Sequence, residues 1–203
     1  MVLESSQSFA FPIIVFLMNK SLRAVPALLL TTSLTLCACS VEGKDQVTMA
    51  ASTKSGISPL GDTNIAMKTS RPNKPAQLLV TDVRLGIHDS FERVVLDLDG
   101  NGDPGWFIDY TDKPMQQGSG ALVQHDGRTT LNVNIDGTVY PHELNMEDPE
   151  LHTVSSQGGF ISQVISTGTY EWRSQFFICL DEARPYSVQV LEDPKRIVID
   201  ILR

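Results

Sequence analysis

The sequence predicts an all-β domain, an antiparallel β-sandwich or open barrel of about seven or eight strands. Three observations support this class. Apolar and polar residues alternate with period two in short runs after residue 77, no stretch there keeps a helical period for three turns, and Gly, Asp and Pro separate the runs. Short alternating runs joined by turns are typical of antiparallel sheets that bury one face.

The individual strands follow from this alternation. In the second strand Val94, Leu96 and Leu98 face inward, and in the first Leu79 and Val83 do. Trp172 and Phe176 are expected to point inward from a later strand, and the acidic stretch 140–151 is expected to be a connection with a helical turn. The expected strands cover residues 79–87, 93–99, 106–110, 129–136, 160–165, 170–180, 186–191 and 196–202.

Residues 1–38 have the order of a secretory signal. Lys20 and Arg23 precede an apolar run over residues 24–34, and small residues follow it. A membrane-spanning helix needs ~20 apolar residues, so this run of about eleven does not predict a transmembrane anchor. A second apolar patch, residues 9–17, precedes the signal, so Met18 is an alternative to Met1 as the true start.

The stretch Leu36-Cys37-Ala38-Cys39 resembles the lipobox of bacterial lipoproteins. The resemblance implies cleavage before Cys39, lipidation of its thiol and amine with chains such as palmitate, and attachment to the membrane at its extracytoplasmic face. Ser40 follows the cysteine and gives no inner-membrane retention signal. The alternative is an ordinary secretion signal that ends near a cysteine.

The mature chain then divides into a tether and a domain. Residues 39–76 lack apolar periodicity and are rich in Ser, Thr, Gly, Lys and Pro, which predicts a flexible tether. Residues 77–203 form the expected domain and carry nine Lys and Arg against twenty Asp and Glu, a net charge of −11. Because phosphate binding depends on Lys and Arg, nucleic acid is excluded as a partner.

Motifs for catalysis and metal binding are weak in this sequence. Asp97 begins a stretch, residues 97–102, that fits the first half of an EF-hand loop, but Ile108 stands where the bidentate Glu belongs. His142 and His152 lie among acids without the spacing of a zinc site. Cys179 is expected to be a buried, inert thiol. We therefore expect no metal, no cofactor and no enzymatic activity.

Three separated motifs resemble the AMIN-like domain of actinobacterial envelope lipoproteins, a distant relative of the amidase N-terminal (AMIN) domain. They are residues 86–96 (GIHDSFERVVL), residues 104–106 (PGW) and residues 193–201 (DPKRIVIDI). The resemblance spans residues 79–202 and implies a β-sandwich that binds or scaffolds in the cell envelope without catalysis. No catalytic domain follows Arg203, so the module is expected to target itself or a partner protein.

The binding residues expected from these motifs are His88, Asp89, Arg93 and Trp106, because binding residues gather at turns and aromatic rings stack on sugars. Under the competing interpretation both residues have structural roles. Trp106 then packs in the core, and Arg93 forms an ion pair with a cross-strand Asp such as Asp82. Tyr110 and Tyr140 are possible helpers in stacking. The leading hypothesis is a lipid-anchored module that recognises an envelope glycan or an envelope-assembly protein. The alternatives are an enzyme that uses acids such as Asp97, Asp99, Glu171 or Asp200, and a purely structural adaptor.

Overall fold

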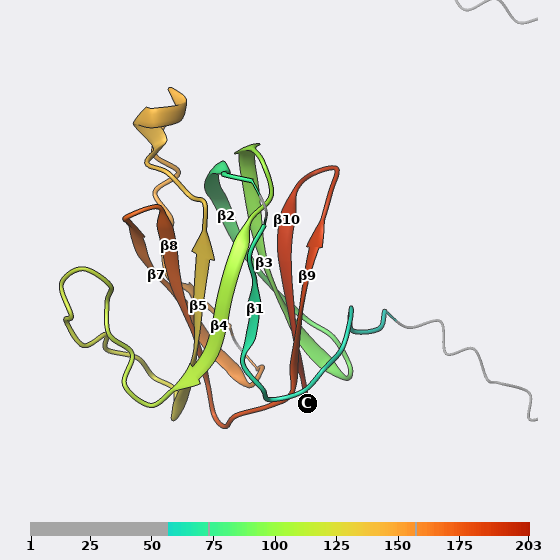
Figure 1. Ribbon diagram of the computed structural model, residues 1–203. Coiled ribbons are helices and arrows are strands. Elements are labelled where there is room, and N and C mark those ends of the chain that lie inside the picture. Colours follow the sequence, from blue (N-terminus) through green and yellow to red (C-terminus); the bar gives the residue numbers. More distant parts are fainter. Residues whose placement is uncertain (1–56, 73, 157) are drawn as a thin grey trace, which may run out of the picture. The chain divides into compact units, whose positions relative to one another are not determined.

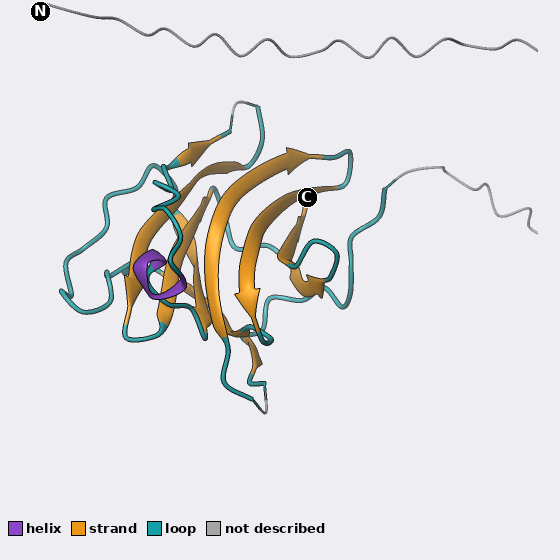
Figure 2. Cartoon of the chain, turned by 90° about the horizontal axis from the view of Figure 1, so that it is seen from above, coloured by secondary structure: helices purple, strands orange, loops and turns teal. Residues whose placement is uncertain are grey.

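The computed structural model describes residues 57–72, 74–156 and 158–203, which form an open sandwich of two antiparallel sheets with six and four strands. Figure 1 shows the two layers and Figure 2 shows the same sheets from above. One 3-10 turn, Pro141–Leu144, lies in the connection expected to hold a helical turn. The expected all-β sandwich is therefore confirmed.

The smaller sheet has the order β2-β3-β10-β9 and the larger has the order β1-β4-β5-β8-β7-β6. The smaller sheet consists of β2 (Gln77–Ile87), β3 (Phe91–Asn101), β9 (Tyr186–Leu191) and β10 (Arg196–Leu202). The larger consists of β1 (Lys68–Ser70), β4 (Gly105–Thr111), β5 (Thr129–Asp136), β6 (Val154–Ser155), β7 (Ile161–Tyr170) and β8 (Arg173–Leu180).

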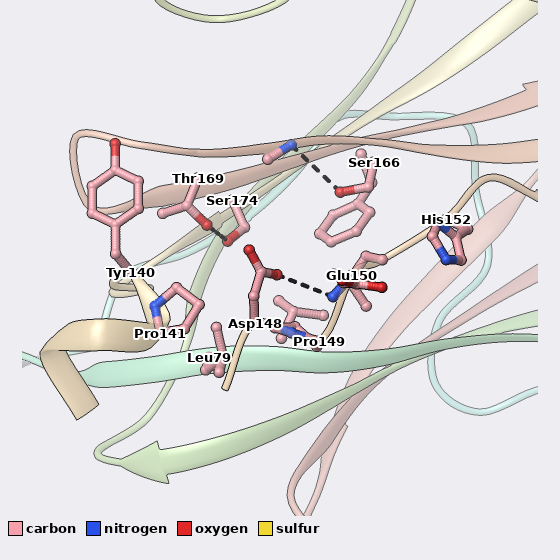
Figure 3. A pocket seen from close by; sticks show the side chains of 14 residues that line it. Leu79, Tyr140, Pro141, Asp148, Pro149, Glu150, His152, Ser166, Thr169 and Ser174 are labelled. Atoms are coloured by element: carbon pink, nitrogen blue, oxygen red, sulfur yellow. Dashed lines mark hydrogen bonds between the residues drawn. The ribbon is translucent and has the colours of Figure 1, made fainter. Parts of the chain in front are cut away.

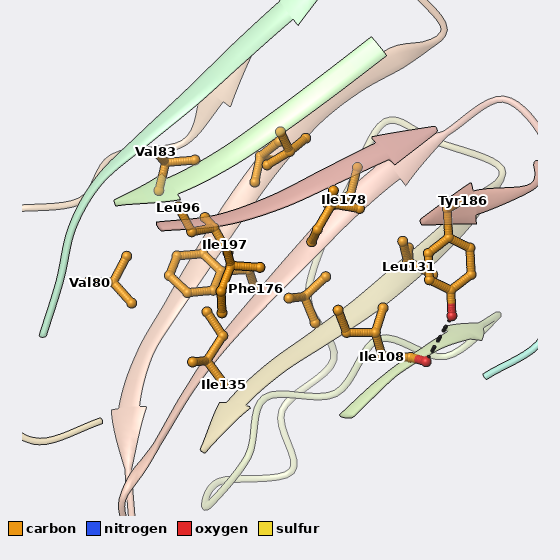
Figure 4. Close-up of a cluster of buried hydrophobic side chains, with 14 of the residues drawn as sticks. Val80, Val83, Leu96, Ile108, Leu131, Ile135, Phe176, Ile178, Tyr186 and Ile197 are labelled. Carbon is orange, nitrogen blue, oxygen red and sulfur yellow. Dashed lines mark hydrogen bonds between the residues drawn. The ribbon is translucent and has the colours of Figure 1, made fainter. Parts of the chain in front are cut away.

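The core fills the space between the two sheets, where alternate side chains of each strand meet (Figure 4). Leu96, Ile108 and Phe176 are almost completely buried there. Tyr186 is also fully buried, and its hydroxyl lies 2.9 Å from the carbonyl oxygens of both Ala66 and Ile108. A buried phenol with an acceptor avoids the cost of an unpaired polar group.

Strand β2 contains a bulge that the alternation did not predict. The register with β3 shifts between Val80 and Asp82, so Leu78 and Val80 face the core before the bulge and Val83 faces it afterwards. The expected inward position of Leu79 is therefore wrong, because one extra residue reverses the faces of the strand.

The expected strand 170–180 is wrong at its start. Strand β7 continues to Tyr170, and Glu171 and Trp172 form a two-residue turn into β8, with φ of 46° and 65°. Trp172 is consequently 57% exposed and does not point into the core, whereas Phe176, Ile178 and Leu180 do as expected. The error arises because Glu-Trp is not a usual signal for this type of turn, which favours Asn-Gly.

Residues 57–66, called the strap below, and β1 lie against the domain although they belong to the expected tether. Lys68–Ser70 pairs with β4, and Asn64 pairs with Tyr186 through two backbone hydrogen bonds of 3.2 and 3.0 Å. The Leu60 amide donates to Asp200 at 2.6 Å. Hydrogen bonds of the backbone hold this segment in place. Its sequence therefore needs no apolar alternation, which is the pattern that would have predicted a strand.

The predicted signal peptide and the predicted lipidation site at Cys39 lie outside the described residues, so both stay predictions. Within the described parts of the chain, no helix is long and apolar enough to cross a membrane.

Candidate functional site

A groove of about 520 Å³ lies between the edge strand β2, the connection from β5 to β6, and strands β7 and β8 (Figure 3). The connection pairs with β2 only at its start, where Leu78 exchanges backbone hydrogen bonds with Gly137 and Val139. Beyond that point the two sheets separate and the groove opens. It is lined by Leu79, Val80, Tyr140, Pro141, Asp148, Pro149, Glu150, Leu151, His152, Ser166, Gly168, Thr169, Ser174 and Phe176.

The groove combines an apolar floor with carboxylates. Leu79, Val80 and Phe176 are buried hydrophobic residues that reach its lining from both sheets. Asp148 and Glu150 line the connection side, where an oxygen of Asp148 accepts a hydrogen bond of 3.0 Å from the Glu150 amide. Lys and Arg are absent from this lining, so the groove favours an uncharged or cationic ligand over an anionic one.

A chain of hydroxyl groups ends in the groove. Ser174 Oγ donates to Thr138 Oγ1 at 2.9 Å, and Thr138 Oγ1 donates to the Ile135 carbonyl at 3.3 Å. Because each hydroxyl has one proton, Thr169 must be the donor in its 2.8 Å contact with Ser174. The lone pairs of Thr169 are then free, and this wall of the groove offers an acceptor to a ligand hydroxyl or amine.

One exposed aromatic ring lies at an end of the groove. Tyr140 lines the groove and is 41% exposed, and its ring stacks on His142 at a centroid distance of 5.6 Å. Tyr170 follows the groove residue Thr169, so its side chain points to the other face of β7, where its ring lies against Gly118. The Trp172 carbonyl accepts hydrogen bonds from the Gly137 and Thr138 amides, which places this turn beside the segment that leads to Tyr140. Exposed aromatic faces of this kind suit stacking on a ligand ring.

Of the four residues expected to form the site, His88, Asp89 and Arg93 lie together near Phe91, whereas Trp106 lies apart from them. His88 and Asp89 lie in the turn between β2 and β3, where the His88 ring stacks on Phe91 at 4.4 Å. Trp106 begins β4, beyond the opposite end of the β2–β3 pair. These strands have eleven residues each, which is roughly 35 Å at ~3.3 Å per residue.

Trp106 packs partly buried against the core, as its competing interpretation proposed. Arg93 forms a two-point ion pair with Asp200 of β10, with distances of 2.6 and 2.8 Å, and the hydrogen bond raises the pKa of Arg93. The partner is therefore not Asp82, which lies 3.8 Å from Arg84. Of the ligand-binding candidates from the sequence, Tyr140 alone lines the groove. No short motif marks the other groove residues, because strands far apart in sequence supply them.

The acids considered for catalysis lie outside the groove, whereas His152, considered for a metal site, lines it. Asp97 binds Arg84 through both carboxylate oxygens, at 2.8 and 2.7 Å, and Asp200 binds Arg93. Neither they nor Asp99 nor Glu171 line the groove. In the described parts of the chain, no three His, Cys, Asp or Glu side chains are placed to hold a metal ion. Cys179 is buried as expected, and burial raises its thiol pKa to about 12.

The two antiparallel sheets and the groove beside β2 define the chain as an all-β sandwich domain. Within this class, residues 78–203 match the model of the AMIN-like domain. The chain therefore belongs to the AMIN-like domain family, as its motifs indicated. No curated protein and no solved structure is significantly similar to it.

Proposed function

We propose that the AMIN-like domain is a non-catalytic binding module that recognises a cell-envelope glycan in the groove between β2 and β7–β8. The observation that carries the proposal is the combination in one groove of an apolar floor, free acceptor oxygens and an aromatic end. Sugars present apolar ring faces and many hydroxyl donors, which fit these two kinds of surface.

The negative charge of the groove limits the kinds of glycan that it can bind. Asp148 and Glu150 line it, and the residues 77–203 carry a net charge of −11. A polyanionic glycan would be repelled, so the ligand is an uncharged or amino-bearing glycan. Lipidation at Cys39, predicted from the sequence, would hold the module at the extracytoplasmic face of the membrane, within reach of such a polymer.

Binding of purified wall polysaccharides and lipoglycans to the full chain tests the proposal. Thr169→Val should weaken binding by about fivefold, because one hydrogen bond is worth ~1 kcal/mol. Tyr140→Ala should weaken it through lost stacking. Thr69→Val on exposed β1 and Phe107→Ala, an exposed aromatic of β4, are matched controls that should bind normally.

Two results would contradict this function. Equal binding by all four variants would exclude the groove as the glycan site. Turnover of a glycan by the chain, abolished by Asp148→Asn or Glu150→Gln, would replace the binding module by an enzyme, the competing hypothesis.

A further inference from the structure

A row of polar side chains crosses the outer face of the smaller sheet. In the strand registers Arg93 of β3 lies opposite Asp200 of β10, and Asp200 lies opposite Ser187 of β9. Directly paired residues place their side chains on the same face, so these three form a continuous line, called the polar row below. Asp200 is fully buried and Ser187 is 1% exposed.

Buried apolar residues flank the polar row. Val95 and Val198 are paired one step along the same strands, on the face of Arg93 and Asp200. Both are buried although they lie outside the main core cluster between the sheets. This outer face therefore has a covered apolar and ionic centre and differs from a solvated sheet face.

The strap is the segment that contacts the polar row. Arg93 Nη2 donates to the Ser58 carbonyl at 3.5 Å, and the Leu60 amide donates to Asp200 Oδ2 at 2.6 Å. Both contacts are made to backbone atoms. Pro59 lies between them and favours an extended conformation at Ser58. The polar row thus binds the backbone of an extended peptide, and these two contacts do not depend on the peptide's side chains.

The strap is held mainly by hydrogen bonds. Ile57 is 66% exposed and Ile65 is 61% exposed, so these two large apolar side chains contribute little burial. The Asn64–Tyr186 bridge and the hydrogen bond from the Tyr186 hydroxyl to the Ala66 carbonyl tie its C-terminal half to β9. Segments with little buried apolar surface open at low free-energy cost, which makes the strap displaceable.

The strap leaves one polar group of the row, the Ser187 hydroxyl, without a hydrogen bond. Its hydroxyl is buried and has no hydrogen-bond partner among the described residues. A buried hydroxyl without a partner is costly, and most such groups in native proteins are paired. A peptide with a polar group opposite Ser187 would satisfy it.

We propose that the polar row is a docking site for an extended peptide of a partner protein that brings a hydrogen-bonding group to Ser187, and that the strap occupies this site in the unbound chain. The backbone contacts of Ser58 and Leu60 support an extended peptide, and the unpaired Ser187 hydroxyl supports the polar group. The partner and the strap compete, so docking releases the segment that leads to the predicted lipid anchor. This site lies on the opposite sheet face from the core and is separate from the groove.

The test uses the full chain and a fluorescent peptide with the strap sequence, residues 57–66. Leu60→Pro removes the amide that donates to Asp200, whereas Leu60→Ala keeps it and serves as the matched control. Leu60→Pro should bind the probe at least about tenfold more tightly than the wild type, because the competing strap is released. Leu60→Ala should stay within about threefold of the wild type.

Hydrogen exchange keeps the test informative if Leu60→Pro does not fold. In the wild-type chain, excess probe should accelerate exchange of the chain's own amides at residues 60–64. Unchanged exchange, or a folded Leu60→Pro that binds the probe no better than the wild type, would overturn the docking site.

The nature of the occupant is tested separately. Ser187→Ala should bind the strap probe as tightly as the wild type, because the strap makes no hydrogen bond with Ser187. Weaker binding by this variant would show that the strap already satisfies Ser187 and would overturn the polar partner. Dimerisation of Leu60→Pro, detected by light scattering, would assign the site to a second copy of the chain and overturn the partner-protein assignment.

Discussion

The Arg93 guanidinium donates hydrogen bonds of 2.6 and 2.8 Å to the two carboxylate oxygens of Asp200, its direct cross-strand neighbour. The Asp200 side chain is completely buried and that of Arg93 is 20% exposed. A charge that is shielded from water in this way depends on its partner for solvation. The pair therefore stabilises the β3–β10 junction and leaves Arg93 little freedom to bind a ligand through its charge.

Arg93→Ala is expected to destabilise the domain by about 3–5 kcal/mol, because it leaves a buried carboxylate without its counter-charge. Urea unfolding followed by circular dichroism measures the loss. Arg173→Ala removes an exposed ion pair with Asp136 and should cost no more than about 1 kcal/mol. Equal effects of the two changes would show that Asp200 is not dependent on Arg93.

Replacing Glu171-Trp172 by Asn-Gly is expected to raise the free energy of unfolding by about 1–2 kcal/mol. Both residues have positive φ, which Asn and Gly adopt at lower cost. Trp172→Ala keeps a side chain at the strained position and should have little effect on stability, since Trp172 is mostly exposed. Thermal and urea unfolding of the two variants separate backbone strain from the role of the aromatic ring.

Stability is expected to fall as the pH rises above about 9, in part through Cys179. Burial raises its thiol pKa to about 12, whereas the unfolded thiol ionises near its ordinary value of 9.0. Above that value the unfolded state binds fewer protons than the folded state, so unfolding becomes easier. The stability difference between the wild type and Cys179→Ala should shrink by about 1–2 kcal/mol between pH 8 and pH 10. A constant difference would contradict the shifted pKa.

A chain that begins at Gln77 is expected to be less stable than one that begins at Ile57, by at least about 3 kcal/mol at ~1 kcal/mol per lost hydrogen bond. It lacks β1, the Asn64–Tyr186 bridge and the Leu60 donor to Asp200. Urea midpoints of the two chains provide the comparison. Equal midpoints would show that residues 57–76 do not stabilise the domain, and the tether would then extend to residue 76 as the sequence predicted.

Cys39→Ala is expected to abolish incorporation of labelled palmitate and to release the chain from the membrane fraction, because the predicted lipid attachment site is lost. Cys37→Ala is the control and should remain labelled, since Cys37 is expected to leave with the signal peptide. An unlabelled wild-type chain would refute the lipoprotein prediction.

The strands with clean alternation were predictable from the sequence. Residues 129–136, 186–191 and 196–202 form β5, β9 and β10 with the expected bounds. Prediction failed where the residues themselves have no preference for the conformation that they adopt. Strand β1 is three residues long and is defined by its partner β4, and Glu-Trp occupies a turn that usually takes Asn-Gly.

The candidate site was less predictable than the fold. Tyr140 was noted as a possible stacking residue, but the hydroxyl chain joins Thr138, Thr169 and Ser174 from three separate segments. Asp148 and Glu150 resembled a solvated acidic loop. Nothing local distinguishes such residues, because the groove exists only once β2 and β7 have been placed in opposite sheets.

The order of the strap's attachments also has a mechanical consequence. A tension applied to the chain before Ile57 acts first on the contacts of Ser58 and Leu60 with Arg93 and Asp200, then on those of Asn64 and Ala66 with Tyr186, and then on the three pairs of β1 with β4. These contacts would break one after another as the segment peels from its end. About fourteen residues, some 45 Å at ~3.3 Å per residue, would be released before the load reaches β2.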